Sequence, residues 1–360
     1  MKGSKPRWMG SSMLKLEQLR VPLIQGGMGI GVSLGNLAGH VMLEGGLGVI
    51  SAAQPGYREV DFYQNTIEAN LRALEKEVDK ARQISQGKGL LGVNVMVAAE
   101  GYDRYVKAIS LMDIDVIISG AGLPLELPSL VGDSKVALAP IVSSAKAAFL
   151  LCKRWLSRSQ RLPDLLIIEG PLAGGHLGFS WSDLIDEKTQ DLTSILHEVR
   201  VVLKDQNWDF PVFVAGGIYT SEDIHYFLNR GAQGVQMATR FIATHECDAD
   251  IQFKQAFIKA KFEDIRFVIS PSGYPGRAIN NPLVDALMRD ETVKVKRCVK
   301  CLKPCKPATT PYCITEALIE AVKGNVHEGL IFTGTKGYRI DKIVSVKELI
   351  EELFSSEVYP

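Results

Sequence analysis

The sequence lacks several features that would assign it to a specialised class. It has no run of about 18 apolar residues, so no membrane-spanning helix is expected. Its first twenty residues are basic but contain no apolar core, which argues against a secretory signal. It also lacks net charge, because 41 Lys and Arg offset 41 Asp and Glu. Without an overall attraction for nucleic acid or anionic lipid, we expect a cytoplasmic protein that binds neither nucleic acid nor membrane.

Heptads, solenoid repeats and low-complexity tracts are absent too. Apolar residues make up 46% and charged residues 23%, which is ordinary for a globular chain and excludes disorder. The chain has six cysteines, and cysteines in a reducing compartment rarely form disulfides. A length of 360 residues suits one large barrel with an appendage.

Eight short apolar runs alternate with helical patterns along the first 245 residues. The runs cover residues 22–25, 48–51, 92–96, 116–119, 136–142, 165–169, 212–215 and 234–237. The clearest helical patterns between them cover residues 66–86, 143–156, 194–205 and 220–230. Continuous apolar runs are typical of strands buried on both faces of a parallel sheet. They predict an α/β protein, a (β/α)8 TIM barrel over residues 1–245, with a doubly wound open sheet as the alternative.

Residues 246–360 do not continue this alternating pattern, and they predict a C-terminal extension that is helical and rich in cysteine. We expect a helical and Cys-rich lid over residues 246–325, and a segment over 326–360 that packs back on the barrel. Helices are predicted over residues 250–263, 315–323 and 346–354, and a loop over 270–277. Within that loop, Arg277 is a candidate either to meet an anionic group or to pair with a carboxylate and fasten the tail.

Glycine and polar residues gather where the predicted barrel strands end. The candidates on this rim are Gln25, Gly26, Met28, Asn94, Glu169, Gly174, Gly175, His176, Ala215, Gly216, Gly217, Gln236, Met237, Ala238 and Thr239. Glycine lets a ligand approach the main chain closely. The last two strands of such a barrel commonly hold phosphate, so Gly216-Gly217 and Ala238-Thr239 predict a phosphate site made of main-chain amides and a hydroxyl.

These motifs together resemble the nitronate monooxygenase family, formerly called the 2-nitropropane dioxygenases. The flavin-dependent enoyl-acyl-carrier-protein reductases share the fold of this family. The resemblance implies an FMN-bound TIM barrel, with the FMN phosphate held by residues 215–217 and 236–239. It also implies that Met28, Asn94 and Gly174-Gly175 lie along the flavin. Glu169 takes the place of a polar flavin contact that is often Gln in the family.

His176 is similar to the catalytic histidine of that family. Its imidazole can take a proton from a carbon acid or give one to a developing carbanion. Two positions depart from the family pattern. Leu172 replaces a common acidic residue, and Ala238 replaces a glycine but keeps its main-chain amide.

Four cysteines fall within sixteen residues, at Cys298, Cys301, Cys305 and Cys313. Four thiolates can close a tetrahedral zinc site or hold a [4Fe–4S] cluster. Unligated cysteines are the third alternative. The first three spacings are similar to the cluster-binding run of some flavin-dependent dienoyl reductases.

Three functions follow from these observations. The first is an FMN-dependent monooxygenase that oxidises alkyl nitronates with dioxygen. The second is an enoyl-thioester reductase, in which NAD(P)H shares the flavin pocket because no separate dinucleotide-binding domain is present. The third is a flavin or metal redox sensor without turnover, against which the Gly-Gly-His motif argues. The first two act on small molecules, and a homo-oligomer remains open.

Overall fold

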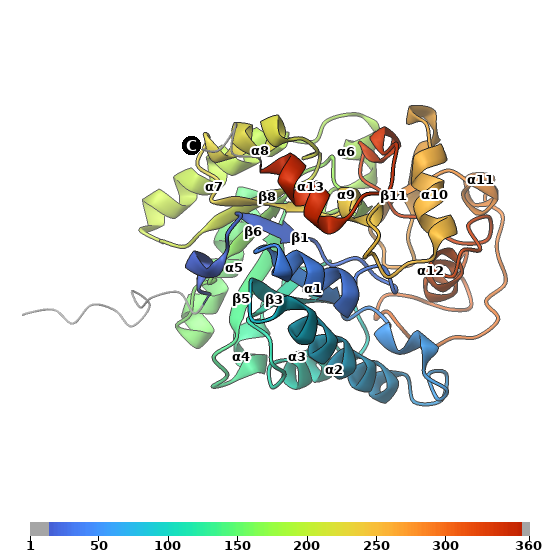
Figure 1. Ribbon diagram of the computed structural model, residues 1–360, viewed down its shortest axis with the longest axis horizontal. Helices are drawn as coiled ribbons and strands as arrows, with labels where there is room; N and C mark the ends of the chain where they lie inside the picture. The colour runs from blue at the N-terminus through green and yellow to red at the C-terminus, as the bar shows by residue number, and fades with distance from the viewer. Residues whose placement is uncertain (1–13, 355–360) are drawn as a thin grey trace, which may run out of the picture.

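Eight parallel strands form a closed barrel in the computed structural model, which describes residues 14–354 (Figure 1). The strands are β1 (Leu23–Gln25), β2 (Leu47–Ser51), β3 (Leu90–Met96), β4 (Val116–Gly120), β5 (Ala137–Val142), β6 (Leu166–Glu169), β8 (Val212–Ala215) and β9 (Gly234–Met237). Each strand pairs with the next, and β9 pairs with β1 through Leu23 and Val235. The predicted (β/α)8 barrel is confirmed, and the open-sheet alternative is wrong.

Helices follow the strands and cover the outside of the barrel. They are α1 (Gly35–Leu43), α2 (Thr66–Ser85), α3 (Tyr102–Ile109), α4 (Leu127–Val131), α5 (Ala145–Ser159), α6 (Trp181–Ile185), α7 (Leu192–Gln206), α8 (Ser221–Leu228) and α9 (Thr239–Ile242). Capping side chains start several of them: Ser144 accepts from the Ala147 amide, and Asp191 accepts from the Thr193 and Ser194 amides. Such caps satisfy amides that have no partner inside the helix.

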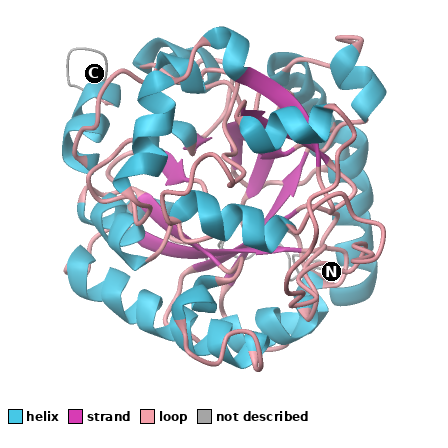
Figure 2. Cartoon of the chain, turned by 90° about the vertical axis from the view of Figure 1, so that its right-hand side faces the viewer, coloured by secondary structure: helices cyan, strands magenta, loops and turns pink. Residues whose placement is uncertain are grey.

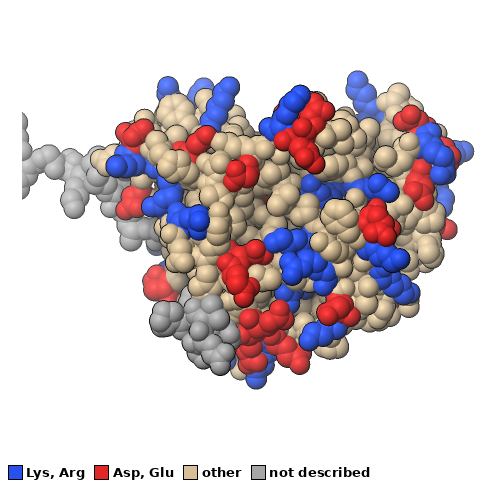
Figure 3. Space-filling view, turned by 90° about the horizontal axis from the view of Figure 1, so that it is seen from above, with Lys and Arg blue, Asp and Glu red and all other residues tan. Residues whose placement is uncertain are grey.

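The barrel strands are apolar on both faces because both faces are buried. One set of side chains, including Ile24, Val49 and Phe213, fills the barrel interior. The alternate set, including Leu91 and Val214, packs against the surrounding helices. Continuous apolar runs are the consequence of this two-sided burial. On the face seen in Figure 3, cationic and anionic side chains are interspersed, in keeping with the zero net charge.

The chain after residue 245, here called the tail, lies mostly at one end of the barrel, at the right of Figure 1. Figure 2 looks onto that end. It contains α10 (Ile251–Lys259), β10 (Ile265–Ile269), β11 (Pro275–Ile279), α11 (Pro282–Met288) and α12 (Ile314–Val322). Short 3-10 turns occur at Leu16–Gln18, Pro55–Arg58, Phe262–Asp264 and Gly337–Arg339.

A small antiparallel sheet joins the tail to the barrel. Its order is β10-β11-β7, where β7 (Gly175–His176) belongs to the loop after β6. The predicted loop over 270–277 is therefore wrong at its end, because residues 275–277 form the central strand. Gly276 pairs with His176 and Arg277 pairs with Gly175, a long-range pairing that local sequence does not encode.

The last helix, α13 (Val346–Leu353), packs beside α1, α8 and α9. Its buried side chains Val346, Leu349, Ile350 and Leu353 belong to the core between the barrel and its helices. Across residues 14–354, no helix combines the length and the apolar character that crossing a membrane requires. Residues 1–13, which carry most of the basic N-terminal segment, lie outside the described part of the chain.

Candidate active site

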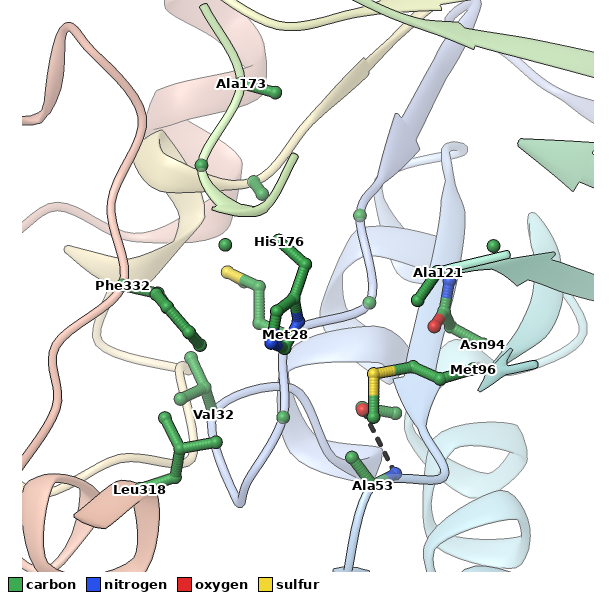
Figure 4. Close-up of a pocket in the computed structure, with 18 of the residues that line it drawn as sticks. Met28, Val32, Ala53, Asn94, Met96, Ala121, Ala173, His176, Leu318 and Phe332 are labelled. Atoms are coloured by element: carbon green, nitrogen blue, oxygen red, sulfur yellow. Dashed lines mark hydrogen bonds between the residues drawn. The ribbon is translucent and has the colours of Figure 1, made fainter. Parts of the chain in front are cut away.

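A cavity of about 280 Å³ opens where the barrel strands end, and residues of the tail close over it. Figure 4 shows His176 and Met28 near its centre, Asn94 and Met96 of β3 on one side, and Phe332 and Leu318 of the tail on the other. The structure brings every predicted catalytic and cofactor-binding residue except Gln25 to this cavity. These residues are Gly26, Met28, Asn94, Glu169, Gly174, Gly175, His176, Ala215, Gly216, Gly217, Gln236, Met237, Ala238 and Thr239.

Gln25 does not reach the cavity. Its side chain is fully buried, accepts a hydrogen bond from the Val49 amide at 3.1 Å and donates to the Gly26 carbonyl at 2.6 Å. Both ends of the amide are thus occupied within the barrel wall. Gln25 shapes the rim between β1 and β2, and its contact with a cofactor stays a prediction that these bonds do not favour.

The loop after β8 presents a concave main-chain surface to the cavity. Gly216 and Gly217 have φ angles of +100° and +80°, a region that residues with a side chain rarely adopt. A Cβ atom on Gly217 would lie 2.9 Å from the Cβ of Leu172, and one on Gly216 would lie 2.9 Å from the Gly170 carbonyl oxygen. Within residues 14–354, the amides of both glycines make no hydrogen bond. Two unsatisfied donors at a glycine turn are suited to bind an anion.

Two polar groups beside this turn also have unused hydrogen-bonding capacity. In the described part of the chain, the buried Oε1 of Gln236 has no hydrogen-bond partner. A buried polar atom of this kind calls for a missing ligand or water. Thr239 Oγ1 accepts from the Gly334 amide at 3.0 Å, which leaves its own hydrogen free to donate.

Glu169 ends β6 inside the cavity. Burial raises the pKa of its carboxyl to about 8, since no nearby cation compensates for the lost hydration. The carboxyl is therefore largely protonated at neutral pH, so that it can donate one hydrogen bond as well as accept.

His176 is held by a chain of buried hydroxyl groups from the tail. Its Nε2 lies 2.8 Å from Ser270 Oγ. Ser270 Oγ already accepts from the Ser272 amide at 3.2 Å and from Ser272 Oγ at 3.0 Å. With Ser270 Oγ accepting from both groups of Ser272, we assign its own hydrogen to the bond with Nε2. The hydrogen of the neutral ring then resides on Nδ1.

Nδ1 is the atom that His176 offers to the cavity. It has no hydrogen-bond partner among residues 14–354, and it is not among the fully buried polar atoms there. Burial lowers the pKa of the imidazole to about 4. His176 is thus a neutral ring that presents an N–H donor to the cavity at ordinary pH.

The strand that carries His176 is fastened by Arg277. This buried guanidinium donates to the carbonyls of Ala173 and Pro171 and lies over the ring of Phe267. Arg277 therefore fastens the tail to the loop after β6, as one sequence-based interpretation had it. It does so through carbonyl oxygens, and the expected carboxylate partner is wrong.

The four cysteines of the tail line a second, smaller cavity next to the first. Within residues 14–354, no three His, Cys, Asp or Glu side chains meet closely enough to hold a metal ion. All four cysteines are free thiols in this structure.

Sequence reasoning missed the contribution of the tail to the cavity. The tail residues that line the cavity include Leu302, Ile314, Thr315, Leu318, Leu330, Phe332 and Thr333. Ser270 contacts the His176 ring at Nε2, and Ser272 donates to Ser270. The Ser-Pro-Ser-Gly run at 270–273 was visible as a turn. Its link to His176 was not, because 94 residues separate Ser270 from His176.

The fold and this cavity define a (β/α)8-barrel enzyme with a positioned histidine at the strand ends. The family model described as nitronate monooxygenase matches residues 10–356. The chain therefore belongs to the nitronate monooxygenase family, and it is a flavin-dependent oxidoreductase that acts on small molecules.

Individual relatives are distant but extend over the whole chain. A probable nitronate monooxygenase of Bacillus subtilis (strain 168) is 23% identical over 373 residues, with 97% of this chain and 99% of that protein covered. The (3aS,4S,5R,7aS)-5-hydroxy-7a-methyl-1-oxo-octahydro-1H-indene-4-carboxyl-CoA dehydrogenase of Rhodococcus jostii (strain RHA1) is 24% identical, with 97% and 96% covered. The structure of FabK from Thermotoga maritima has a TM-score of 0.72 and 24% identity, with 98% and 95% covered.

Proposed function

We propose that the chain binds FMN in this cavity and oxidises alkyl nitronates with dioxygen. The observation that carries the proposal is His176, whose Nε2 contacts Ser270 while the rest of its ring lines a cavity with a glycine-rich turn at one end. Bound FMN would supply the exchange of electrons between the substrate and dioxygen.

The unsatisfied groups of the cavity match the groups of FMN. The amides of Gly216 and Gly217, with the hydroxyl of Thr239, would hold the phosphate as neutral donors. The orphaned Gln236 Oε1 would accept from a ribityl hydroxyl or from the ring. Met28, Asn94, Glu169, Gly174 and Gly175 would border the ring, where glycine leaves room for a flat group.

His176 suits a substrate that is already an anion. A nitronate has lost its carbon-bound proton before it binds, and its negative charge resides mainly on two oxygens. An N–H donor stabilises that charge, whereas a base would find no proton to remove. The neutral nitroalkane needs a base, and the nitrogen of His176 that could act as one accepts from Ser270 instead.

The experiment is oxygen uptake by the FMN-loaded protein with an alkyl nitronate and, separately, with the parent nitroalkane. We expect turnover with the nitronate and at least about tenfold less with the nitroalkane. Changing His176 to Ala should lower kcat by about 10²-fold, the usual effect of removing one donor to a charged group. Equal rates on the two substrates would refute the donor role. Unchanged turnover in the His176→Ala variant would show that His176 has no catalytic role.

A second candidate is an NAD(P)H-dependent enoyl-thioester reductase. The full-length likeness to a carboxyl-CoA dehydrogenase favours it, since that relative is named for a thioester substrate. Here the same Nδ1–H would donate to the thioester carbonyl oxygen. Anaerobic addition of NADH or NADPH separates the candidates: rapid bleaching of the flavin absorbance supports the reductase, and a persistent yellow colour supports the monooxygenase.

A further inference from the structure

The second cavity is bordered by all four cysteines of the tail. Cys298, Cys301, Cys305 and Cys313 surround a volume of about 270 Å³. Cys301, Leu302 and Ile314 also line the candidate active site. The two cavities therefore share a wall, and Cys301 lies in it.

We propose that this cavity binds a [4Fe–4S] cluster, with the four cysteines as its thiolate ligands. A single zinc ion would draw four sulfurs to about 2.3 Å from one point, and so to about 3.8 Å from one another. In residues 14–354, no three such side chains lie close enough together to hold a single metal ion. A cubane cluster takes one thiolate at each iron corner, so its ligands surround a volume instead of meeting at a point.

The size of the cavity agrees with a polynuclear group. Its 270 Å³ far exceeds the roughly 10–15 Å³ that a cavity needs to hold one water molecule. Apart from the cysteines, its walls include apolar side chains such as Val295, Val299 and Leu302. An apolar wall limits the access of water to a cluster, which iron–sulfur sites require for stability and potential.

The main chain around the first two cysteines is shaped to donate to sulfur. The Lys300 amide donates to Cys298 Sγ at 3.4 Å. Lys300 adopts a φ of +50°, an uncommon conformation for a residue with a side chain. This turn places an amide on the sulfur two residues earlier, and amide donors of this kind stabilise a thiolate ligand.

The segment is also held firmly over the barrel. The Glu100 amide donates to the Cys301 carbonyl at 3.0 Å, and the Lys303 amide donates to the Ala98 carbonyl at 2.9 Å. Ala99 and Leu302 form an antiparallel bridge between these bonds. The ligand segment is thereby fixed to the residues that follow β3, and Cys301 has a defined position at the shared wall.

The cations of the segment complement the proposed ligand and outnumber the two nearby carboxylates, Glu100 in the cavity wall and Glu316, which accepts from the Lys296 and Arg297 amides. Residues 294–306 contain no Asp or Glu, and they carry Lys294, Lys296, Arg297, Lys300, Lys303 and Lys306. All six cations are exposed, and none forms an ion pair within residues 14–354. An oxidised [4Fe–4S] core with four thiolates has a net charge of −2, which such a cationic segment stabilises.

The test is anaerobic purification of the full chain, with reconstitution by ferrous iron and sulfide, followed by analysis of iron, acid-labile sulfide and zinc. We expect about four irons and four sulfides per chain. Bound zinc, iron without sulfide, or no metal would each overturn the proposal. The readout does not depend on turnover, so it stands or falls separately from the proposed nitronate oxidation.

Alanine variants locate the cluster. Cys298→Ala and Cys305→Ala should each reduce bound iron to less than half. Cys152→Ala and Cys247→Ala are matched controls, because both thiols are buried away from this cavity, and they should keep the full iron content. Circular dichroism of each variant confirms that it is folded. Full iron in a folded Cys298→Ala, Cys305→Ala double variant would contradict the ligand assignment.

Discussion

The chemistry of His176 is set by the side chains behind it. A free imidazole has a pKa near 6.5 and exchanges its hydrogen between two nitrogens. Here burial and the Ser270 hydroxyl stabilise one neutral form, with Nδ1–H toward the cavity. Ser270 would thus contribute to catalysis through His176, as a positioning residue.

Changing Ser270 to Ala should shift the pH dependence of nitronate oxidation. Burial, which lowers the pKa of His176 to about 4, is unchanged in this variant, but the hydroxyl that donates to the neutral ring is lost, so the pKa should rise above that value. The acid limb of kcat/KM should move upward by at least about one pH unit, and kcat should fall by about tenfold. The measurement is a pH profile from 4.5 to 8.

Ser272→Ala is the control for that change. It removes a donor to Ser270 but leaves the Ser270 hydroxyl beside Nε2, so the acid limb should move less. An identical profile for the wild type and Ser270→Ala would mean that the serine does not set the state of the histidine.

Glu169 should make the flavin-free protein less stable as pH rises. The carboxyl ionises above pH 4.5 in the unfolded chain but stays protonated to about 8 in the folded one. The folded state therefore binds the extra proton between these values, and stability is lost as pH increases across that window. Changing Glu169 to Gln should raise the free energy of unfolding by roughly 2–4 kcal/mol at pH 8.5, and by less at pH 5.5.

Thermal unfolding of both proteins at the two pH values measures this. The gain in the Tm of Glu169→Gln should be several degrees at pH 8.5 and clearly smaller at pH 5.5. A gain that is equal at both values would show that the carboxyl is ionised in the folded protein across the whole range.

At the scale of elements, the barrel was predictable and the tail sheet was not. Each barrel strand carries its own signal, because burial on both faces demands a continuous apolar run. The glycine turn after β8 was also visible, since only glycine tolerates its φ angles. The pairing of β11 with β7 depends on residues about 100 positions apart, and so does the contact of Ser270 with His176.

Gln25 shows why a single strand end is ambiguous. A polar residue at the end of a strand has the pattern of a ligand contact, but its amide can equally satisfy the main chain of its neighbours. Val49 and Gly26 occupy both ends of the Gln25 amide. Whether such a residue contacts a ligand or the neighbouring main chain depends on the register between β1 and β2. The sequence of one strand alone does not give that register.

Changing Gly217 to Ala should weaken FMN binding by about 10–100-fold. The new Cβ would meet Leu172 at 2.9 Å in a backbone conformation that disfavours it, so the turn must move and its amide turns away from the phosphate. Fluorescence titration of the flavin-free protein with FMN gives the change in Kd.

Gly87→Ala is the matched control. Gly87 has a φ of +78°, close to the +80° of Gly217, but nothing lies within 4 Å of its added Cβ. It should cost about 1 kcal/mol of stability and leave the Kd for FMN unchanged. An equal Kd for FMN in the wild type and Gly217→Ala would show that this turn does not bind the phosphate.

At the scale of the whole molecule, barrel and tail share one active site. The barrel supplies the glycine rim and the loop that bears His176, and the tail supplies the hydroxyl chain, the cover and Arg277. The zero net charge is compatible with the proposed phosphate site, which would use main-chain dipoles and would not need an overall positive field.

The most direct measurement compares FMN with riboflavin in a titration of the flavin-free protein, followed by flavin fluorescence. The account predicts tight binding of FMN and binding of riboflavin that is about 10²-fold weaker, because riboflavin has no phosphate to accept from the Gly216-Gly217 turn. Failure to bind FMN, or equal affinity for both flavins, would contradict it.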